Sequence, residues 1–460
     1  MPYSRSKRIK SLAFAVCLSA VALARGAQAG EGVKIPFEKL QLANGMTVIL
    51  HQDRTVPLVV VNISYNVGSR FEVPGRTGFA HLFEHLMFMG TRRAPTKMFD
   101  AWMEAAGGWN NAWTSEDRTD YYDVAPPPAL DLLLWLEADR LRDLGPLMTK
   151  EKLDAQRDVV RNERRQTSEN TPYGKVELRL PELMYPEGHP YHHPVIGSHA
   201  DLEAASVQDV QSFFDTYYDP ANASLVVAGD FERDKALGLV RARFESIPAR
   251  RSFSDPGAPG FSDQKSTLTQ VVRETIEDDV EAPKVVIAWQ SPKHFGAGDA
   301  DLDVAAGLLA SGKSSRLYKT LVYDKKLAQS VDASQQSGVL GSRFVVSAVA
   351  RKGVKPADVE AALMAEVRKL TREGGNAEEL TRVKNGIEAS FVVRLEGLRE
   401  RASLLNLYQA ERGDPGFAPQ DLERYTRVDN LTVKATMQRV LRDDAHVVLT
   451  VVPRKEGAKP

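Results

Sequence analysis

The sequence lacks three features after residue 29. It has no cysteine, no cluster of basic residues and no hydrophobic run long enough to cross a membrane. Without cysteine that part of the chain has no disulfides, and without a basic cluster it has no electrostatic footprint for nucleic acid. The single cysteine of the chain, Cys17, lies in the N-terminal segment.

Residues 1–29 predict a secretory signal peptide. Four basic residues between positions 5 and 10 precede an apolar run from Leu12 to Leu23, and Ala27-Gln-Ala29 suits cleavage before Gly30. The run is too short for a typical membrane span, and Arg25 interrupts its end. Cleavage removes five of the 60 basic residues and none of the 61 acidic ones, which leaves a net charge of −6. We expect a periplasmic protein, and secretion further out stays open.

Two histidines and a glutamate in the segment His81-Leu-Phe-Glu84-His85 predict a metal site. The surrounding run, 77–91, is apolar with helical character, so these three side chains share one helix face. Two imidazoles one turn apart can hold Zn²⁺, and the carboxylate between them can take a proton from an attacking water. The order H-x-x-E-H is that of the inverzincins, the reverse of the common H-E-x-x-H.

A structural interpretation of the same residues stays open. His81 and His85 would then be a packed pair in the core, with Glu84 solvated. The run around them is apolar on nearly every side, where a carboxylate without a charged neighbour is costly. A metal would supply that charge. A catalytic zinc site also requires a third protein ligand, with one position left for water.

A candidate third ligand lies in the stretch 152–165, whose apolar residues recur at helical spacing. Arg157, Val159, Val160 and Glu163 match a motif R-x-V-V-x-x-E. Together with H-x-x-E-H, these residues resemble the pitrilysin-type metallopeptidases, the family of insulin-degrading enzyme and the mitochondrial processing peptidases.

The resemblance implies a zinc metalloendopeptidase. His81, His85 and Glu163 would bind one Zn²⁺, and Glu84 would be the general base. One departure is Gln156, at a position where the family often has a second glutamate. A glutamine can accept a hydrogen bond but adds no negative charge beside the ligands, so zinc affinity is expected to be tuned and not abolished.

The roughly 430 residues after the leader are too many for one compact core. A segment rich in proline and glycine begins at Pro248 and marks a boundary. We therefore predict an N-terminal metal-binding domain at 30–247, a linker at 248–266 and a metal-free C-terminal domain at 267–460.

The sequence predicts that the second domain repeats the pattern of the first, because strand-like segments recur at similar offsets. Residues 58–63 are matched by 285–289, and residues 224–228 by 446–451. The fold class is therefore α+β with two tandem halves. The resemblance implies an antiparallel sheet layered with helices in each half, and a clam-like shell around a peptide chamber. Val304–Ala310, at the position of the zinc helix in the second half, has no ligand and no base.

The segment 107–122 contains Trp, Thr and Tyr at intervals typical of extended structure. In the resembled family the matching N-A-x-T strand is an edge strand that receives the substrate peptide. Asn111 and Ala112 would then offer backbone hydrogen bonds to an extended substrate. Trp113 would lie near the side-chain pocket and favour apolar residues, although a tryptophan of the core fits the pattern equally well.

The second half departs from the family at two positions. Members that act alone present an arginine and a tyrosine after a segment resembling Ser315-Arg316-Leu317, and these positions fall on Val322 and Gln329. The resemblance therefore implies a heterodimer, in which a paralogous subunit without H-x-x-E-H supplies the arginine and tyrosine. A self-sufficient homodimeric peptidase and a non-catalytic scaffold subunit are the alternatives, and scaffolding alone does not need an intact set of ligands.

Overall fold

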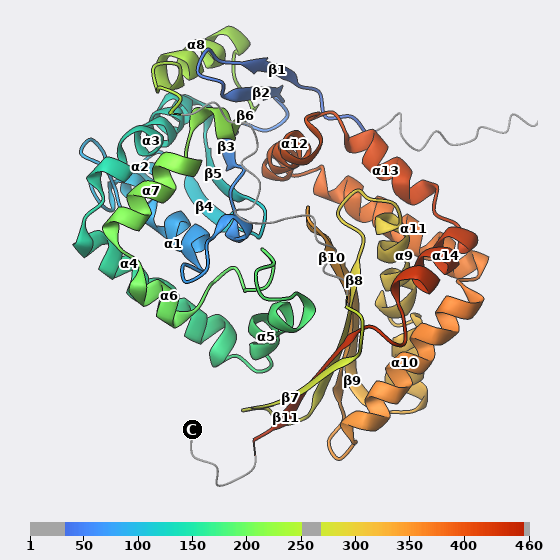
Figure 1. The fold of residues 1–460 in the computed structure, drawn as a ribbon. Coiled ribbons are helices and arrows are strands. Elements are labelled where there is room, and N and C mark those ends of the chain that lie inside the picture. The colour runs from blue at the N-terminus through green and yellow to red at the C-terminus, as the bar shows by residue number, and fades with distance from the viewer. Residues whose placement is uncertain (1–32, 251–267, 455–460) are drawn as a thin grey trace, which may run out of the picture.

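The computed structural model describes residues 33–250 and 268–454. Residues 33–250 form one sheet with its helices, residues 268–454 form a second, and the two halves lie side by side (Figure 1). The predicted signal peptide and nearly all of the predicted linker at 248–266 lie outside the described residues.

A six-stranded sheet forms the base of the first half. In order across the sheet, its strands are β1 (Glu38–Gln41), β2 (Thr47–Gln52), β6 (Ala223–Gly229), β3 (Val59–Tyr65), β5 (Thr119–Ala125) and β4 (Trp109–Thr114). Neighbouring strands are antiparallel except for the parallel pair β2 and β6. The predicted substrate strand, β4, lies at the edge of the sheet.

The second sheet repeats this topology with five strands. Their order is β7 (Val272–Asp278), β11 (Val447–Pro453), β8 (Lys284–Ser291), β10 (Ser342–Ala350) and β9 (Ala328–Gln336). Here too one pair, β7 and β11, is parallel and the others are antiparallel. The segments matched in the sequence are β3 with β8 and β6 with β11, so the predicted tandem α+β halves are confirmed.

Helices cover both sheets. In the first half they are α1 (Phe79–Leu86), α2 (Met98–Ala105), α3 (Leu130–Asp143), α4 (Lys150–Arg164), α5 (Lys175–Met184), α6 (His199–Ala204), α7 (Val207–Tyr217) and α8 (Arg233–Phe244). In the second half they are α9 (Asp299–Ala310), α10 (Pro356–Glu373), α11 (Ala377–Arg394), α12 (Leu398–Arg412), α13 (Ala418–Thr426) and α14 (Asn430–Val440). Within the described ranges, no helix combines the length and the apolar character that a membrane crossing requires.

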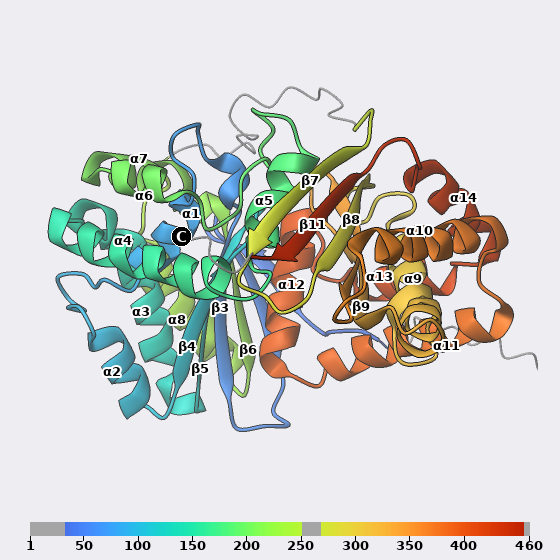
Figure 2. The same cartoon turned by 90° about the horizontal axis from the view of Figure 1, so that it is seen from below.

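The two halves exchange one helix each. Helix α5 of the first half packs on the second sheet, where Val176, Leu180 and Met184 join buried residues of β8, β10 and β11. Helix α12 of the second half packs on the first sheet, where its apolar residues join buried residues of β2, β3, β5 and β6. Figures 1 and 2 both show α5 against the second sheet and α12 against the first. Each sheet is therefore covered partly by a helix from the other half.

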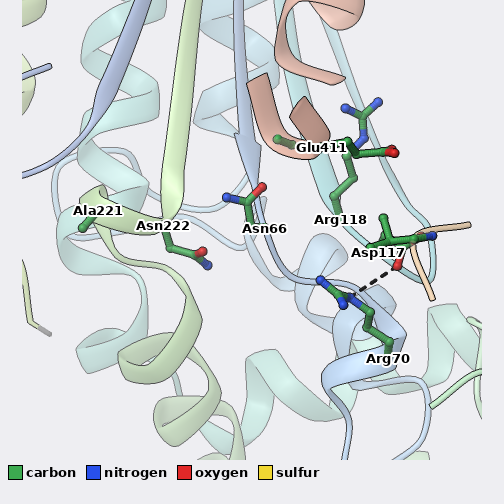
Figure 3. A pocket seen from close by; sticks show the side chains of 9 residues that line it. Asn66, Arg70, Asp117, Arg118, Ala221, Asn222 and Glu411 are labelled. Carbon is green, nitrogen blue, oxygen red and sulfur yellow. Dashed lines mark hydrogen bonds and ion pairs between the residues drawn. The ribbon is translucent and has the colours of Figure 1, made fainter. Parts of the chain in front are cut away.

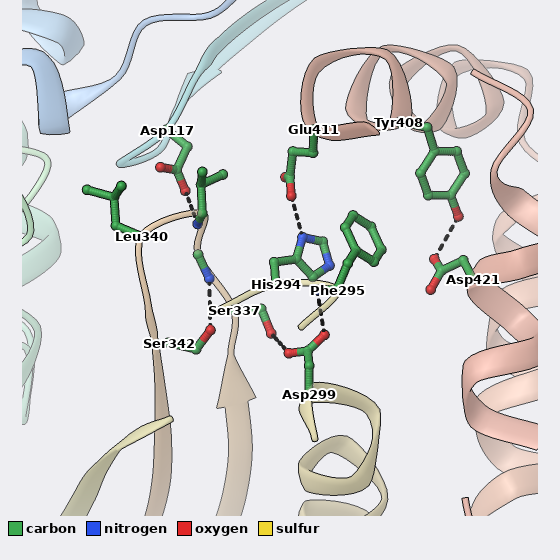
Figure 4. Close-up of polar contacts among 12 residues, drawn as sticks. Asp117, His294, Phe295, Asp299, Ser337, Leu340, Ser342, Tyr408, Glu411 and Asp421 are labelled. Atoms are coloured by element: carbon green, nitrogen blue, oxygen red, sulfur yellow. Dashed lines mark hydrogen bonds and ion pairs between the residues drawn. The ribbon is translucent and has the colours of Figure 1, made fainter. Parts of the chain in front are cut away.

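A polar contact joins the halves where the edge strand β4 ends. The Asp117 carboxylate accepts a hydrogen bond from the Tyr191 hydroxyl at 2.6 Å. It also accepts one from the Val339 N–H of the second half at 3.1 Å (Figure 4). Arg70 Nε lies 3.3 Å from Asp117 Oδ1, beside a cavity of about 340 Å³ that residues of both halves line (Figure 3). The turn that follows β4 is thus held by residues of both halves.

A second contact near this boundary predicts a pH-dependent stability. His294 Nδ1 lies 2.8 Å from Glu411 Oε2 on α12 (Figure 4). Burial alone would lower the pKa of His294, but the hydrogen bond to Glu411 and the charges of Glu411 and Asp299 outweigh it and raise the pKa. The contribution to stability is fully present below the unfolded-state pKa of about 6.5, and it is lost as pH rises through the raised folded-state pKa.

We therefore expect His294→Gln to destabilise the protein more at about pH 5.5 than at about pH 8.5. Urea unfolding of wild type and variant at both pH values measures the two differences in free energy of unfolding. Equal differences at the two pH values would contradict the role given to His294.

Candidate metal centre

The helix that carries the H-x-x-E-H motif is shorter than predicted. Only Phe79–Leu86 of the predicted run 77–91 is α-helical. After the helix the chain passes through hydrogen-bonded turns and adopts a left-handed conformation at Gly90, with φ 75°, which does not continue an α-helix. Eight residues are still enough to keep the three side chains of the motif on one helix face.

Helix α4 brings Glu163 to the two histidines. It packs against α1, with Leu153 and Val160 buried on its inner side. Glu163 Oε2 lies 3.2 Å from His85 Nε2 and 3.7 Å from His81 Nε2. The structure therefore brings the three predicted ligands together around one carboxylate oxygen.

These distances fit a zinc ion. Two ligand atoms at about 2.0–2.1 Å from one tetrahedral Zn²⁺ lie about 3.3–3.5 Å apart. The separations of 3.2 and 3.7 Å bracket that value. Two imidazoles and one carboxylate also form a typical donor set of catalytic zinc sites, which keep a fourth position free for water or substrate.

Glu84 is close to the same centre but is held by a different partner. The ligand atoms of His81, Glu84 and His85 lie within 4.8 Å of one another, so proximity alone would admit Glu84 as a ligand. However, the buried Glu84 carboxylate accepts a hydrogen bond from Thr114 Oγ1 on β4 at 2.6 Å. Glu163, whose oxygen approaches both histidines, is therefore the better-placed candidate for the third ligand, and Glu84 lies beside them with its carboxylate held by Thr114.

Thr114 was not predicted as a site residue. It is the last residue of the N-A-x-T motif, and side chains alternate along a strand, so Ala112 and Thr114 share one face of β4. Ala112 packs on the core that contains α1, and Thr114 reaches Glu84. The alternation could have placed Thr114 toward α1, but its partner could not be read without the position of the helix.

The pKa values of the four ionisable groups at the site are shifted in different directions. Burial, aided by the charge of His85, lowers the pKa of His81 to about 4, so its imidazole is neutral and able to bind a metal. Burial raises the pKa of Glu84 despite the Thr114 hydrogen bond. The hydrogen bond from His85 lowers the pKa of Glu163 and keeps this carboxylate ionised. The pKa of His85 is raised, because hydrogen bonding and charge from the two glutamates outweigh its burial.

Gln156 lies beside the candidate ligand His85, as the sequence predicts. Its side chain hydrogen-bonds to His85, and its Nε2 donates to Met89 Sδ at 2.8 Å. The neutral amide thus contacts one of the candidate metal ligands, where a second glutamate would have added a charge.

The three residues predicted to contact substrate lie on β4 but face different ways. Ala112 N–H donates to Asn111 Oδ1 at 2.8 Å. Trp113 packs partly buried on the core formed with α12, with Arg118 over its ring at 4.8 Å. The structure brings Ala112 and Thr114 to the α1 side of the strand and leaves Trp113 on the opposite face.

The second half offers no counterpart of this centre. In the ranges 33–250 and 268–454, the group on α1 is the only cluster of three or more metal-binding side chains close enough to hold one ion. Val322 is packed in the core of the second half, and Gln329 donates from Nε2 to Ala350 O at 2.9 Å. Neither supplies an arginine or a tyrosine hydroxyl.

Two family models match most of the chain. The family described as Insulinase (Peptidase family M16) matches residues 47–195, and the one described as Peptidase M16 inactive domain matches residues 204–387. The first match contains α1 and α4 with the three candidate ligands. The second begins at the end of α6, includes α7, β6 and α8 of the first half, and ends within α11 of the second half.

Individual proteins are similar over nearly the whole length. The zinc protease PqqE of Helicobacter pylori is 30% identical over 383 residues, which cover 83% of this chain and 85% of that protein. A probable mitochondrial-processing peptidase subunit beta of Arabidopsis thaliana is 23% identical over 427 residues, which cover 90% and 77%. The crystal structure of a protease from Helicobacter pylori superimposes with a TM-score of 0.85 at 26% identity, covering 92% of this chain and 100% of that one.

Proposed function

The chain belongs to peptidase family M16, and we propose that it is a zinc-dependent endopeptidase that hydrolyses unfolded peptides. One observation carries the proposal: Glu163 Oε2 lies close to the Nε2 atoms of both His81 and His85. Glu84 is held beside them by Thr114. A structural metal site would be closed by a fourth protein ligand. In the described part of the chain, the side chains gathered closely enough to hold one ion are His81, Glu84 and His85, and Glu163 approaches both histidines from α4.

Three side chains would hold the metal, and Glu84 would move the proton. Zinc bound by His81, His85 and Glu163 would polarise the peptide carbonyl and make water more acidic. Glu84 accepts a proton from the attacking water and delivers it to the leaving amine. Its raised pKa suits a group that must take and return a proton near neutral pH. Thr114 occupies Glu84 Oε2, which leaves Oε1 to carry the proton.

Thr114→Val tests this orientation of the base. The substitution keeps the shape of the side chain but removes the hydroxyl that donates to Glu84. We expect kcat to fall about 10- to 100-fold, as for groups that orient an active-site residue, with the zinc dissociation constant unchanged. Thr114→Ser keeps the hydroxyl and should retain most of the activity. Equal kcat values for the valine variant and wild type would remove Thr114 from the mechanism.

The substrate would bind as an added strand on β4. An exposed edge strand offers main-chain donors and acceptors to an extended peptide, which recognises backbone before side chains. The Ala112 N–H, now bonded to the Asn111 side chain, becomes a donor to substrate when that side chain turns away. The Ala112 backbone would thus pair with the peptide, while the Asn111 backbone faces β5, because consecutive residues of a strand direct their backbone groups to opposite edges. Trp113 lies on the face away from α1 and would contact only substrate side chains on that face. This mode requires an unfolded segment.

The active enzyme is proposed to be a heterodimer. Two points support this: the resemblance puts Val322 and Gln329 where a self-sufficient member would have arginine and tyrosine, and the Arabidopsis relative is described as one subunit of a peptidase. A paralogous chain without H-x-x-E-H would supply the missing pair. The alternatives are a self-sufficient homodimer and a scaffold subunit. The intact set of His81, Glu84, His85 and Glu163 speaks against the scaffold.

Hydrolysis of an internally quenched, unstructured peptide by the purified, zinc-loaded chain tests the function. Glu84→Gln serves as the blank. Activity that disappears in the blank would support the peptidase and make it self-sufficient, which contradicts the heterodimer. Zinc binding without hydrolysis, followed by hydrolysis when a paralogous partner is added, is the outcome expected here. No hydrolysis under any condition would favour the scaffold.

The leader predicted at residues 1–29 further leads us to propose a periplasmic enzyme, acting on peptides that are already unfolded. Fractionation of the cells that make the protein would test this location.

A further inference from the structure

The first turn of the metal-binding helix has no cap of its own. The residue before α1 is Gly78, which has φ 86° and no side chain to accept a hydrogen bond. The first N–H groups of any α-helix have no partner within the helix. A helix of eight residues gains little stability from its own hydrogen bonds, so the loss of a cap has a large relative effect.

A larger residue cannot replace Gly78. A Cβ atom there would lie 2.7 Å from Ile196 O and 2.9 Å from the Gly197 Cα, and the positive φ is unfavourable for other residues. The usual capping residues, Ser, Thr, Asp and Asn, are therefore excluded from this position. The cap has to come from elsewhere in the chain.

Glu72 provides it. Its Oε2 accepts a hydrogen bond from Gly78 N–H at 2.9 Å and its Oε1 one from Ala80 N–H at 2.7 Å, and the Phe79 N–H also contributes. The side chain is fully buried, with His193 Nδ1 3.5 Å from Oε2. Burial raises the pKa of Glu72, while the backbone N–H donors act in the opposite direction by stabilising the carboxylate. The hydrogen bonds to these N–H groups are the cap.

We propose that Glu72 is a positioning residue for the metal centre, acting as a remote cap that fixes the first turn of α1. The residue after the last capped amide is His81. The two histidines must present both Nε2 atoms to one ion, so a frayed first turn would move His81 relative to His85 and Glu163. Glu72 touches neither metal ligands nor substrate and acts only through the helix. This inference rests on the zinc site of the proposed function.

The zinc dissociation constant, measured by competition with a chelator, is the readout. For Glu72→Ala we expect an increase of about 10- to 100-fold, the range typical of groups that orient metal ligands. Glu72→Gln should be intermediate, because its amide NH₂ would face one of the backbone N–H donors. In the metal-free protein, hydrogen exchange of amides 78–82 should be faster in Glu72→Ala than in wild type.

Ser206→Ala is a matched control. Ser206 caps α7 in the same half of the protein, with its hydroxyl accepting from Asp209 N–H at 3.1 Å, and it contacts no part of the metal centre in the described residues. Loss of this cap should destabilise the same half and leave the zinc dissociation constant unchanged.

Three results would overturn the inference. They are a wild-type zinc dissociation constant in Glu72→Ala, an equal increase in Ser206→Ala, and unchanged hydrogen exchange at 78–82. If Glu72→Ala does not fold, Glu72→Gln decides, and a wild-type constant there overturns the inference. Failure of the wild-type chain itself to bind zinc would instead contradict the proposed function.

Discussion

Glu84→Gln is expected to bind zinc as tightly as wild type and to lose at least about a hundredfold in kcat, the lower limit typical of a general base. The amide has nearly the shape of the carboxylate and can still accept the Thr114 hydrogen bond at the same oxygen. It cannot accept a proton from water. The loss should therefore appear in turnover, with little change in zinc content or in stability.

Zinc content by atomic spectroscopy and initial rates on the quenched peptide, with any required partner present, measure the two quantities. The control is Thr114→Ser, which changes a neighbour of the same carboxylate and keeps the hydrogen bond. Full activity in Glu84→Gln would exclude Glu84 as the base. Loss of zinc in this variant would show that Glu84 is a ligand, as its distance from the histidines permits.

Glu163→Ala should have the opposite effect. Removal of the third ligand leaves two imidazoles, and we expect zinc affinity to fall by more than the 10- to 100-fold typical of residues behind the ligands. Activity would be lost as a consequence. The apo fold should persist, because the Glu163 side chain is 37% exposed and, among the residues that the structure describes, makes ion pairs only with the two histidines.

Asp158→Ala on the same helix is the control. The Asp158 side chain is exposed, and the residue lies five positions before Glu163 in the sequence. Isothermal titration of the metal-free variants with zinc gives affinity and stoichiometry. An unchanged stoichiometry and affinity in Glu163→Ala would mean that another group is the third ligand.

The sequence alone was sufficient for features that depend on local patterns. The histidines, Glu84 and Glu163 lie in short helical motifs, and their convergence follows once the two helices pack. The duplication was visible because strands β3 and β8, and β6 and β11, recur at similar offsets. The length of α1 was overestimated, because the apolar run continues through residues 87–89 although the chain has already turned.

Other features depend on contacts between distant parts of the chain. The partner of Thr114 is set by how α1 packs on β4. The cap of α1 comes from Glu72 because Gly78 is pressed against residues 196–197. The parallel pair β2 and β6 joins strands about 170 residues apart. Periodicity along the sequence contains no signal for such pairings.

The exchange of α5 and α12 determines when the first core can be completed. Helix α12 begins at Leu398, about 170 residues after the last strand of the first sheet ends at Gly229. In an exported chain, that sheet face stays uncovered until the α12 residues have also crossed the membrane. During this time an apolar surface is open to chaperones and to aggregation. A chain truncated before α12 would keep that surface permanently, so we expect the first half to need α12 of the second half to cover its core.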